Sequence, residues 1–180
     1  MAHKPRPQDL AYGTVRRSIP SASVSHDTLV TRLHAALDAY VTLKALGRLW
    51  VGMDVVLDRQ GEIVLQPDIS FVVDGRESIV SDRILGPPDM VLELGSPLMH
   101  AGRLDERVAW FSLYGVREYW LVQPQHEDVT ILELANGGVR RRRLFDDITP
   151  LQSPLLPEFD RCLGELLSSS AEAEPYRRAT

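Results

Sequence analysis

Residues 86–97 have the sequence GPPDMVLELGSP. The apolar run at 90–94 lies between two turn-forming stretches, Gly-Pro-Pro and Gly-Ser-Pro, and this pattern predicts a short buried strand. Glu93 lies inside the run, with apolar residues before and after it. Burying a carboxylate costs much free energy unless a counter-charge or a metal ion accompanies it. Glu93 therefore marks a candidate functional site.

A second acidic residue begins another strand-like run. Residues 67–73 have the sequence PDISFVV, in which alternation puts Asp68 on the same face as Ser70 and Val72. Two acids on neighbouring strands form a candidate site for a divalent metal ion, and their oxygen ligands suit Mg²⁺. Such an ion can activate water and stabilise charge on a phosphate. The alternative is that Asp68 caps a turn and Glu93 pairs with an arginine.

The segment after this strand predicts a helix over residues 101–114, ended by Gly115. At about 100° per residue, Arg103 and Arg107 fall on the same side as Trp110 and Tyr114, within the apolar arc. An arginine that points inward needs an anion, which an acidic side chain or a substrate phosphate would supply. The alternative is that both arginines extend outward from the border of the apolar arc.

The remaining pattern predicts a helix followed by strands, the helix at 101–114, and more strands. We expect the first helix at 25–46, with Ser25 as its N-cap and Gly47 as its end. Strands are expected at 49–57, 62–66, 68–73, 90–94, 118–122, 129–134 and 139–144, with a polar loop at 74–88 and a last short helix at 163–167. This order predicts an α/β or α+β fold with a mixed central β-sheet flanked by helices. Residues 1–20 are expected to be a loose lead-in, 21–167 a single domain and 168–180 a flexible tail.

Composition limits the possible partners. The chain has 180 residues, a net charge of −5 and a pI near 5.5, so a nucleic acid would need a local basic patch to bind. The longest basic cluster, 140–143, is flanked by apolar residues and favours an edge strand protected by charge over a binding site. No apolar run is long enough to cross a bilayer, so we expect no membrane partner.

The cysteine and histidine content limits the possible disulfides and metal sites. Cys162 is the one cysteine, which excludes an intrachain disulfide and is typical of a cytoplasmic protein. His26, in the first turn of the opening helix, could reach a metal ion or contact solvent. The sequence contains no HExxH, GxSxG, P-loop or GxGxxG motif.

Several blocks of sequence together resemble one known family. The blocks are Pro-Asp at 67–68, GPPDMVLELGSP at 86–97, GVREYWLVQP at 115–124, SPLLPEF at 153–159 and SHDTLVTRL at 25–33. They resemble the Uma-two-type restriction endonucleases, members of the PD-(D/E)XK nuclease superfamily, over about residues 10–167. The resemblance implies a restriction-endonuclease-like core and a phosphodiesterase site that uses Mg²⁺ or Mn²⁺.

The resemblance also implies roles for individual residues. Asp68 matches the motif aspartate and Glu93 the second acid, so these two would hold the metal ion. Arg107 stands where the family has its catalytic lysine, and Arg103 stands where it has an aspartate. We therefore expect Asp68, Glu93 and Arg107 to be catalytic. Phosphate-binding or supporting roles are expected for Arg103, His26 and Ser96.

The two arginines leave three functions open. The first is a Mg²⁺-dependent endonuclease that acts on nucleic acid, with DNA favoured over RNA as the substrate. The arginines could impair its activity, because arginine does not readily lose its proton. The second is a non-catalytic protein that binds nucleic acid or phosphate on a nuclease scaffold. The third is a structural homodimer, and a homodimer is also the oligomeric state expected for the nuclease.

Overall fold

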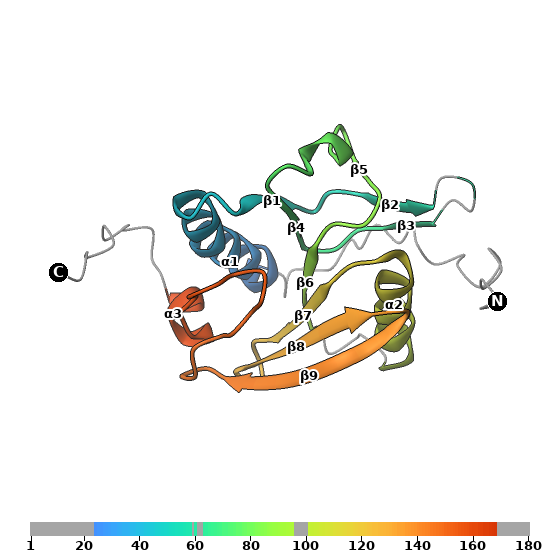
Figure 1. Cartoon of the computed structure of the whole chain (residues 1–180). Coiled ribbons are helices and arrows are strands. Elements are labelled where there is room, and N and C mark those ends of the chain that lie inside the picture. The colour runs from blue at the N-terminus through green and yellow to red at the C-terminus, as the bar shows by residue number, and fades with distance from the viewer. Residues whose placement is uncertain (1–23, 59, 61–62, 96–100, 169–180) are drawn as a thin grey trace.

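A mixed six-stranded sheet forms the centre of the molecule (Figure 1). The computed structural model describes residues 24–58, 60, 63–95 and 101–168, except the side chains of 24, 25, 101–103 and 168. The sheet order is β1-β4-β6-β7-β8-β9. These strands are β1 Gly47–Val51, β4 Ile69–Val73, β6 Met90–Leu94, β7 Glu118–Gln123, β8 Asp128–Ala135 and β9 Gly138–Asp146. Only β6 and β7 run parallel; the other neighbours are antiparallel. The expected mixed α+β architecture is confirmed.

Helices cover both faces of this sheet. Helix α1 (Val24–Leu43) and helix α3 (Leu163–Ser168) lie on one side, and α2 (Ala101–Tyr114) lies on the other (Figure 1). The helix expected at 101–114 has those bounds, because its apolar arc faces the sheet while Asp105 and Glu106 face solvent. Within the described residues, no helix is long and apolar enough to cross a membrane.

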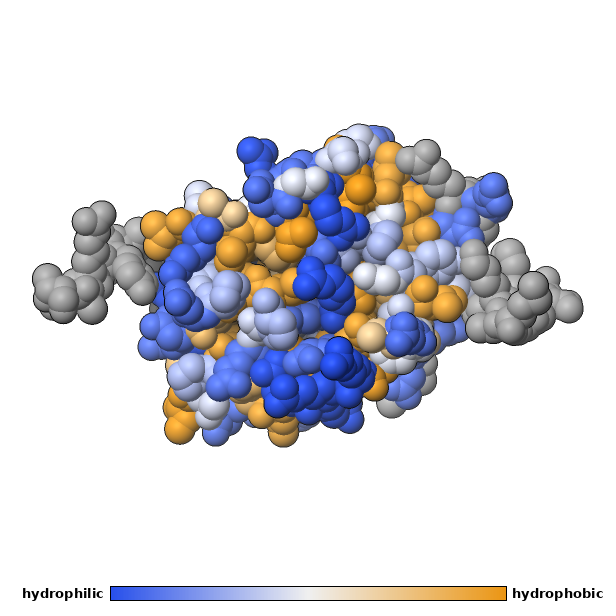
Figure 2. All heavy atoms as spheres, in the orientation of Figure 1, coloured by the Kyte–Doolittle hydropathy of each residue, from blue (hydrophilic) through white to orange (hydrophobic). Residues whose placement is uncertain are grey.

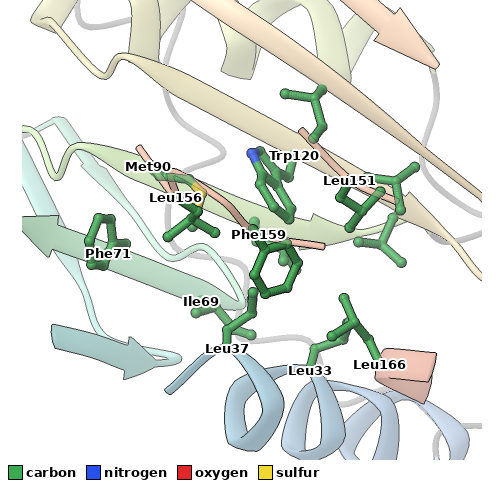
Figure 3. Close-up of a cluster of buried hydrophobic side chains, with 14 of the residues drawn as sticks. Leu33, Leu37, Ile69, Phe71, Met90, Trp120, Leu151, Leu156, Phe159 and Leu166 are labelled. Atoms are coloured by element: carbon green, nitrogen blue, oxygen red, sulfur yellow. The ribbon is translucent and has the colours of Figure 1, made fainter. Parts of the chain in front are cut away.

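Two apolar clusters follow from the alternation of the strands. The α1 cluster joins α1 and α3 to the sheet and to the segment after β9, and Figure 3 shows its side chains pointing toward one another. Its labelled members are Leu33, Leu37, Ile69, Phe71, Met90, Trp120, Leu151, Leu156, Phe159 and Leu166. The α2 cluster, on the opposite face, contains Val91, Tyr119 and Leu121 from the sheet and Val108, Trp110 and Phe111 from α2. Glu93 lies on this second face, because it alternates with Leu92 and Leu94 of the α1 cluster.

The prediction of a single strand over residues 49–57 is wrong. The chain forms β1, turns at Gly52, and then forms β2 (Val55–Asp58) in a second, three-stranded sheet of order β3-β2-β5. Gly52 has a φ of 59°, a left-handed conformation that favours glycine, so the strand breaks there. Strands β3 (Ile63–Leu65) and β5 (Ile84–Leu85) complete that sheet, and a 3₁₀ helix, η2 (Glu77–Ile79), lies in the expected polar loop.

The first helix ends earlier than the sequence predicts. It ends at Leu43, and Gly47 is the first residue of β1. A Cβ atom on Gly47 would lie 2.1 Å from the carbonyl oxygen of Val72, so this glycine allows β1 and β4 to approach closely. Ser25 lies within the helix, so its expected N-cap role is wrong.

Candidate functional site

Strand pairing brings the two predicted acids together. In the antiparallel register of β4 and β6, Ile69 lies opposite Leu92. One further step along that register places Asp68 opposite Glu93, at a position where cross-strand Cβ atoms are about 4.5–5.5 Å apart. Like charges at such positions repel, so this pair needs a neighbouring cation.

Arg107 supplies that cation to Glu93. Its Nε donates to both carboxylate oxygens of Glu93, at 3.0 and 3.1 Å, and its Nη2 donates to Oε1 as well. The side chain of Glu93 is 4 % exposed and that of Arg107 is 26 % exposed. Because Glu93 is buried away from water, this planar, forked contact with Arg107 is the main interaction that neutralises its negative charge. The inward direction of Arg107 is therefore confirmed, and the outward alternative is wrong for this residue.

Tyr119 is a further partner of Glu93 that the sequence did not identify. Its hydroxyl donates to Oε2 of Glu93 at 2.6 Å. Burial, and then the negative charge of Glu93, raise the pKa of Tyr119 well above its usual value, so the phenol keeps its proton. The available signal was a general one: a tyrosine inside the buried strand EYWLVQ needs a partner for its hydroxyl.

Asp68 is less completely neutralised than Glu93. Its Oδ2 accepts the backbone N–H of Leu94 at 2.7 Å, and its Oδ1 lies 3.5 Å from Nε2 of His26. That contact is an ion pair only when the imidazole is protonated. Burial raises the pKa of Asp68, although the hydrogen bond from Leu94 opposes the shift. The site thus contains a half-buried carboxylate with one oxygen that has no short hydrogen bond among the described residues.

Of the other three predicted site residues, the structure places one at the site and does not describe the side chains of the other two. His26, in α1, does come to the site through its contact with Asp68. Arg103 lies in α2, but its side chain is outside the described residues, and so is Ser96 as a whole. The carbonyl of Gln66 is an additional neighbour, 3.5 Å from Nη2 of Arg107.

The donor set can be tested against the metal ion that the sequence predicts. Among the described residues, no three His, Cys, Asp or Glu side chains are grouped as a metal site. Mg²⁺ does not need three, since it usually takes one or two carboxylates and keeps several waters. Asp68 fits this requirement, because its Oδ1 accepts no hydrogen bond from the residues that the structure describes and has His26 Nε2 near it, at 3.5 Å. Glu93 fits less well, because Arg107 and Tyr119 already occupy both of its oxygens.

Comparisons with known proteins identify the fold and the family of this chain. A crystal structure from Anabaena variabilis, described as "a putative nuclease belonging to DUF820", is similar to the structure of this chain with a TM-score of 0.65. It is 18% identical in sequence, and the match covers 79% of this chain and 80% of that chain, which shows a shared fold. No curated protein matches significantly. The family model Uma2, described as "Putative restriction endonuclease", matches residues 4–168. This chain therefore belongs to the Uma2 family of restriction-endonuclease-like proteins.

Proposed function

We propose that this protein is an endonuclease that hydrolyses phosphodiester bonds in DNA with the help of Mg²⁺ or Mn²⁺. The observation that carries the proposal is the charge balance of the site. Asp68 and Glu93 are two acids with one firmly bound cation, Arg107. A phosphodiester is also negative, so it would be repelled unless a second cation accompanied it. Family membership supports a nuclease in general, and this balance supports a metal-dependent one.

Asp68 is the proposed main ligand of the metal ion. Its Oδ1 accepts no hydrogen bond from the described residues, and the partial burial of the group favours a cation beside it. The ion would supply an activated water and would neutralise charge on the phosphate. Glu93 would share the ion only where Arg107 turns away from it, because both of its oxygens now accept hydrogen bonds.

Arg107 is the proposed phosphate-binding residue. Nε and Nη2 contact Glu93, while Nη1 has no acceptor within the described parts of the chain. Since the side chain is about a quarter exposed, Nη1 can donate to a phosphate oxygen without breaking the contact with Glu93. Arginine keeps its proton, so Arg107 would stabilise charge and would not act as a base.

A plasmid assay tests this function. Purified protein is incubated with supercoiled DNA and Mg²⁺, Mn²⁺ or EDTA, and nicking is followed with time. We expect Asp68→Asn to lower the rate by at least about 100-fold, because it removes the charge that would hold the ion. Asp74→Asn is the matched control, since Asp74 is an exposed carboxylate that follows β4. Nicking that continues at the same rate in Asp68→Asn would show a contaminant and contradict the proposal.

A second function is favoured by one specific observation. Both oxygens of Glu93 are engaged by Arg107 and Tyr119, so Arg107 takes the place that a shared metal ion would need. The protein would then bind nucleic acid on a nuclease scaffold without cutting it.

This second function has its own test. It predicts DNA binding that weakens with salt, and no nicking with any metal ion. The double substitution Arg103→Asp with Arg107→Lys would restore the residues implied by the family resemblance, and we expect it to recover nicking. A double variant that folds, binds DNA and still does not nick would contradict a simple loss at these two positions.

Two further expectations stay predictions. We expect a cytoplasmic protein that forms a homodimer, and light scattering of the purified chain would measure its mass. Pairing through β9 would bring arginines of two copies together, so we expect a dimer to use another surface.

A further inference from the structure

Strand β9 carries four consecutive arginines at the edge of the central sheet. Residues Arg140, Arg141 and Arg142 are exposed, and Arg143 is half-buried. In Figure 2 the most hydrophilic colour gathers over this strand. The net charge of the chain is −5, so removing the +4 of this strand leaves −9 for all other residues. The arginines are thus a local basic surface on an otherwise acidic protein.

The four arginines are not equivalent, because one acid neutralises only two of them. Glu133 on β8 accepts a hydrogen bond from Arg143 at 2.9 Å and lies 3.9 Å from Arg141. Arg140 and Arg142 have no acidic partner among the residues that the structure describes. These two are therefore available to an external anion.

The pairing of β8 and β9 explains this division. Arg141 lies opposite Glu133, while Arg142 lies opposite Leu132, a member of the α2 cluster. Arg142 therefore shares the face of the sheet on which Glu93 lies. Between Val139 and Arg141 the register shifts, which leaves Arg140 as the extra residue of a β-bulge.

The register also relates this surface to the candidate site. A row of paired residues crosses the sheet from Glu93 on β6 to Leu144 on β9. Between them it passes through Leu121 on β7 and Thr130 on β8. Three strand spacings separate β6 from β9, about 14 Å, and Arg142 is two residues along β9, about 7 Å. Arg142 is thus roughly 16 Å from Glu93 along the same face. At 3.4 Å per nucleotide of a duplex strand, about five phosphates span that distance.

Protection of the edge strand from aggregation explains the arginines less completely. Charged side chains on an edge strand prevent it from pairing with another strand, whichever face of the sheet they occupy. That role does not explain why Arg140 and Arg142 have no acidic partner among the described residues, or why Arg142 lies on the face of the sheet that holds the candidate site.

We infer that Arg140 and Arg142 form a docking surface for the phosphate backbone of DNA, next to the candidate site. This inference rests on the proposed action on nucleic acid. The surface binds backbone without reading sequence, so it adds affinity and salt dependence. Arg141 and Arg143, neutralised by Glu133, contribute much less.

A pair of double variants tests the inference. Binding of a fluorescein-labelled 20-base-pair DNA is measured by anisotropy in EDTA over a series of salt concentrations. For Arg140→Gln with Arg142→Gln, we expect the slope of log affinity against log salt to shrink by about 1.8, or about 0.9 for each lost contact. Arg141→Gln with Arg143→Gln is the matched control on the same strand and is expected to change the slope little. Circular dichroism confirms that each variant is folded.

Three results would overturn the inference: equal slopes for wild type and the first variant, equal losses in both variants, or no binding by wild type at low salt. The last would also remove the basis of the proposed function. A reduced slope in the first variant alone supports the surface even if wild type nicks no plasmid. In that case the proposed cleavage fails and the docking surface stands.

Discussion

Two buried glutamates on neighbouring strands are stabilised in different ways. Glu93 on β6 faces α2 and receives hydrogen bonds from Arg107 and Tyr119. Glu118 on β7 faces the opposite side and receives hydrogen bonds from Nε1 of Trp120, at 2.8 Å, and from Oγ of Ser153. Both are almost completely buried. One is thus paired with a cation, and the other mainly with neutral donors.

Glu118 holds part of the fold together, whereas Glu93 belongs to the candidate site. Ser153, which binds Glu118, also accepts the backbone N–H groups of Leu155 and Leu156, so the carboxylate fastens the segment after β9 to the sheet. That segment contributes Leu151, Leu156 and other side chains to the α1 cluster (Figure 3). Glu93 instead lies beside Asp68 in the candidate site, where Arg107 binds Glu93 and His26 contacts Asp68.

The largest effect is expected from removing the cation that binds Glu93. In Arg107→Met, Glu93 keeps its burial and loses its counter-charge, so the free energy of unfolding should fall by about 3 kcal/mol. This lies at the low end of the usual range because Arg107 is partly exposed. Urea unfolding at neutral pH measures the change.

The matched control for this prediction removes both charges. Glu93→Gln combined with Arg107→Met should recover most of the lost stability, because no buried charge then lacks a partner. A single variant that loses less than about 1 kcal/mol would mean that the pair does not stabilise Glu93 as described.

A smaller effect is expected from Tyr119→Phe. This change removes one hydrogen bond to the carboxylate of Glu93 and leaves Arg107 in place, so we expect a loss of about 2 kcal/mol. The fall should be about 1 kcal/mol or less when Glu93 is already glutamine, because a hydrogen bond to a neutral group is weaker. Equal losses in both backgrounds would show that Tyr119 acts through packing alone.

The smallest loss is expected at Glu118, and it should depend on pH. Burial raises the pKa of Glu118 above 4.5, and hydrogen bonds from Trp120 and Ser153 oppose that shift. A carboxylate whose pKa is raised by folding stabilises the folded protein most at pH values below its pKa in the unfolded chain. That contribution is lost as the pH rises through its pKa in the folded protein. Glu118→Gln should therefore cost about 1 kcal/mol near neutral pH and more near pH 5.

Unfolding of wild type and Glu118→Gln at pH 5 and pH 7.5 measures this difference. A larger loss at pH 7.5 would reverse the sign and contradict a raised pKa for Glu118. Asp146→Asn is a control, because hydrogen bonds from Thr149 lower the pKa of that exposed carboxylate. The contribution of a carboxylate with a lowered pKa is lost only below its unfolded pKa of 3.8, so the loss in Asp146→Asn should be the same at pH 5 and pH 7.5.

Much of the candidate site could be predicted from local patterns. Glu93 was identified because a charge inside an apolar run needs a partner, and Arg107 because helical periodicity directs it inward. Tyr119 was missed because alternation does not show which hydroxyl reaches which acid. The break at Gly52 was missed because the apolar alternation continues across it, although the two halves belong to different sheets.

By itself, the sequence determined the buried strand at 90–94, the helix at 101–114 and the acids and arginines that these elements carry. Period and composition act over a few residues, and both are present in the chain before it folds. Only the tertiary structure decided that Arg107 binds Glu93, that Tyr119 shares this acid, and that Asp68 accepts the backbone N–H of Leu94. These contacts join residues 14 to 26 positions apart, and strand register and helix packing set their distances.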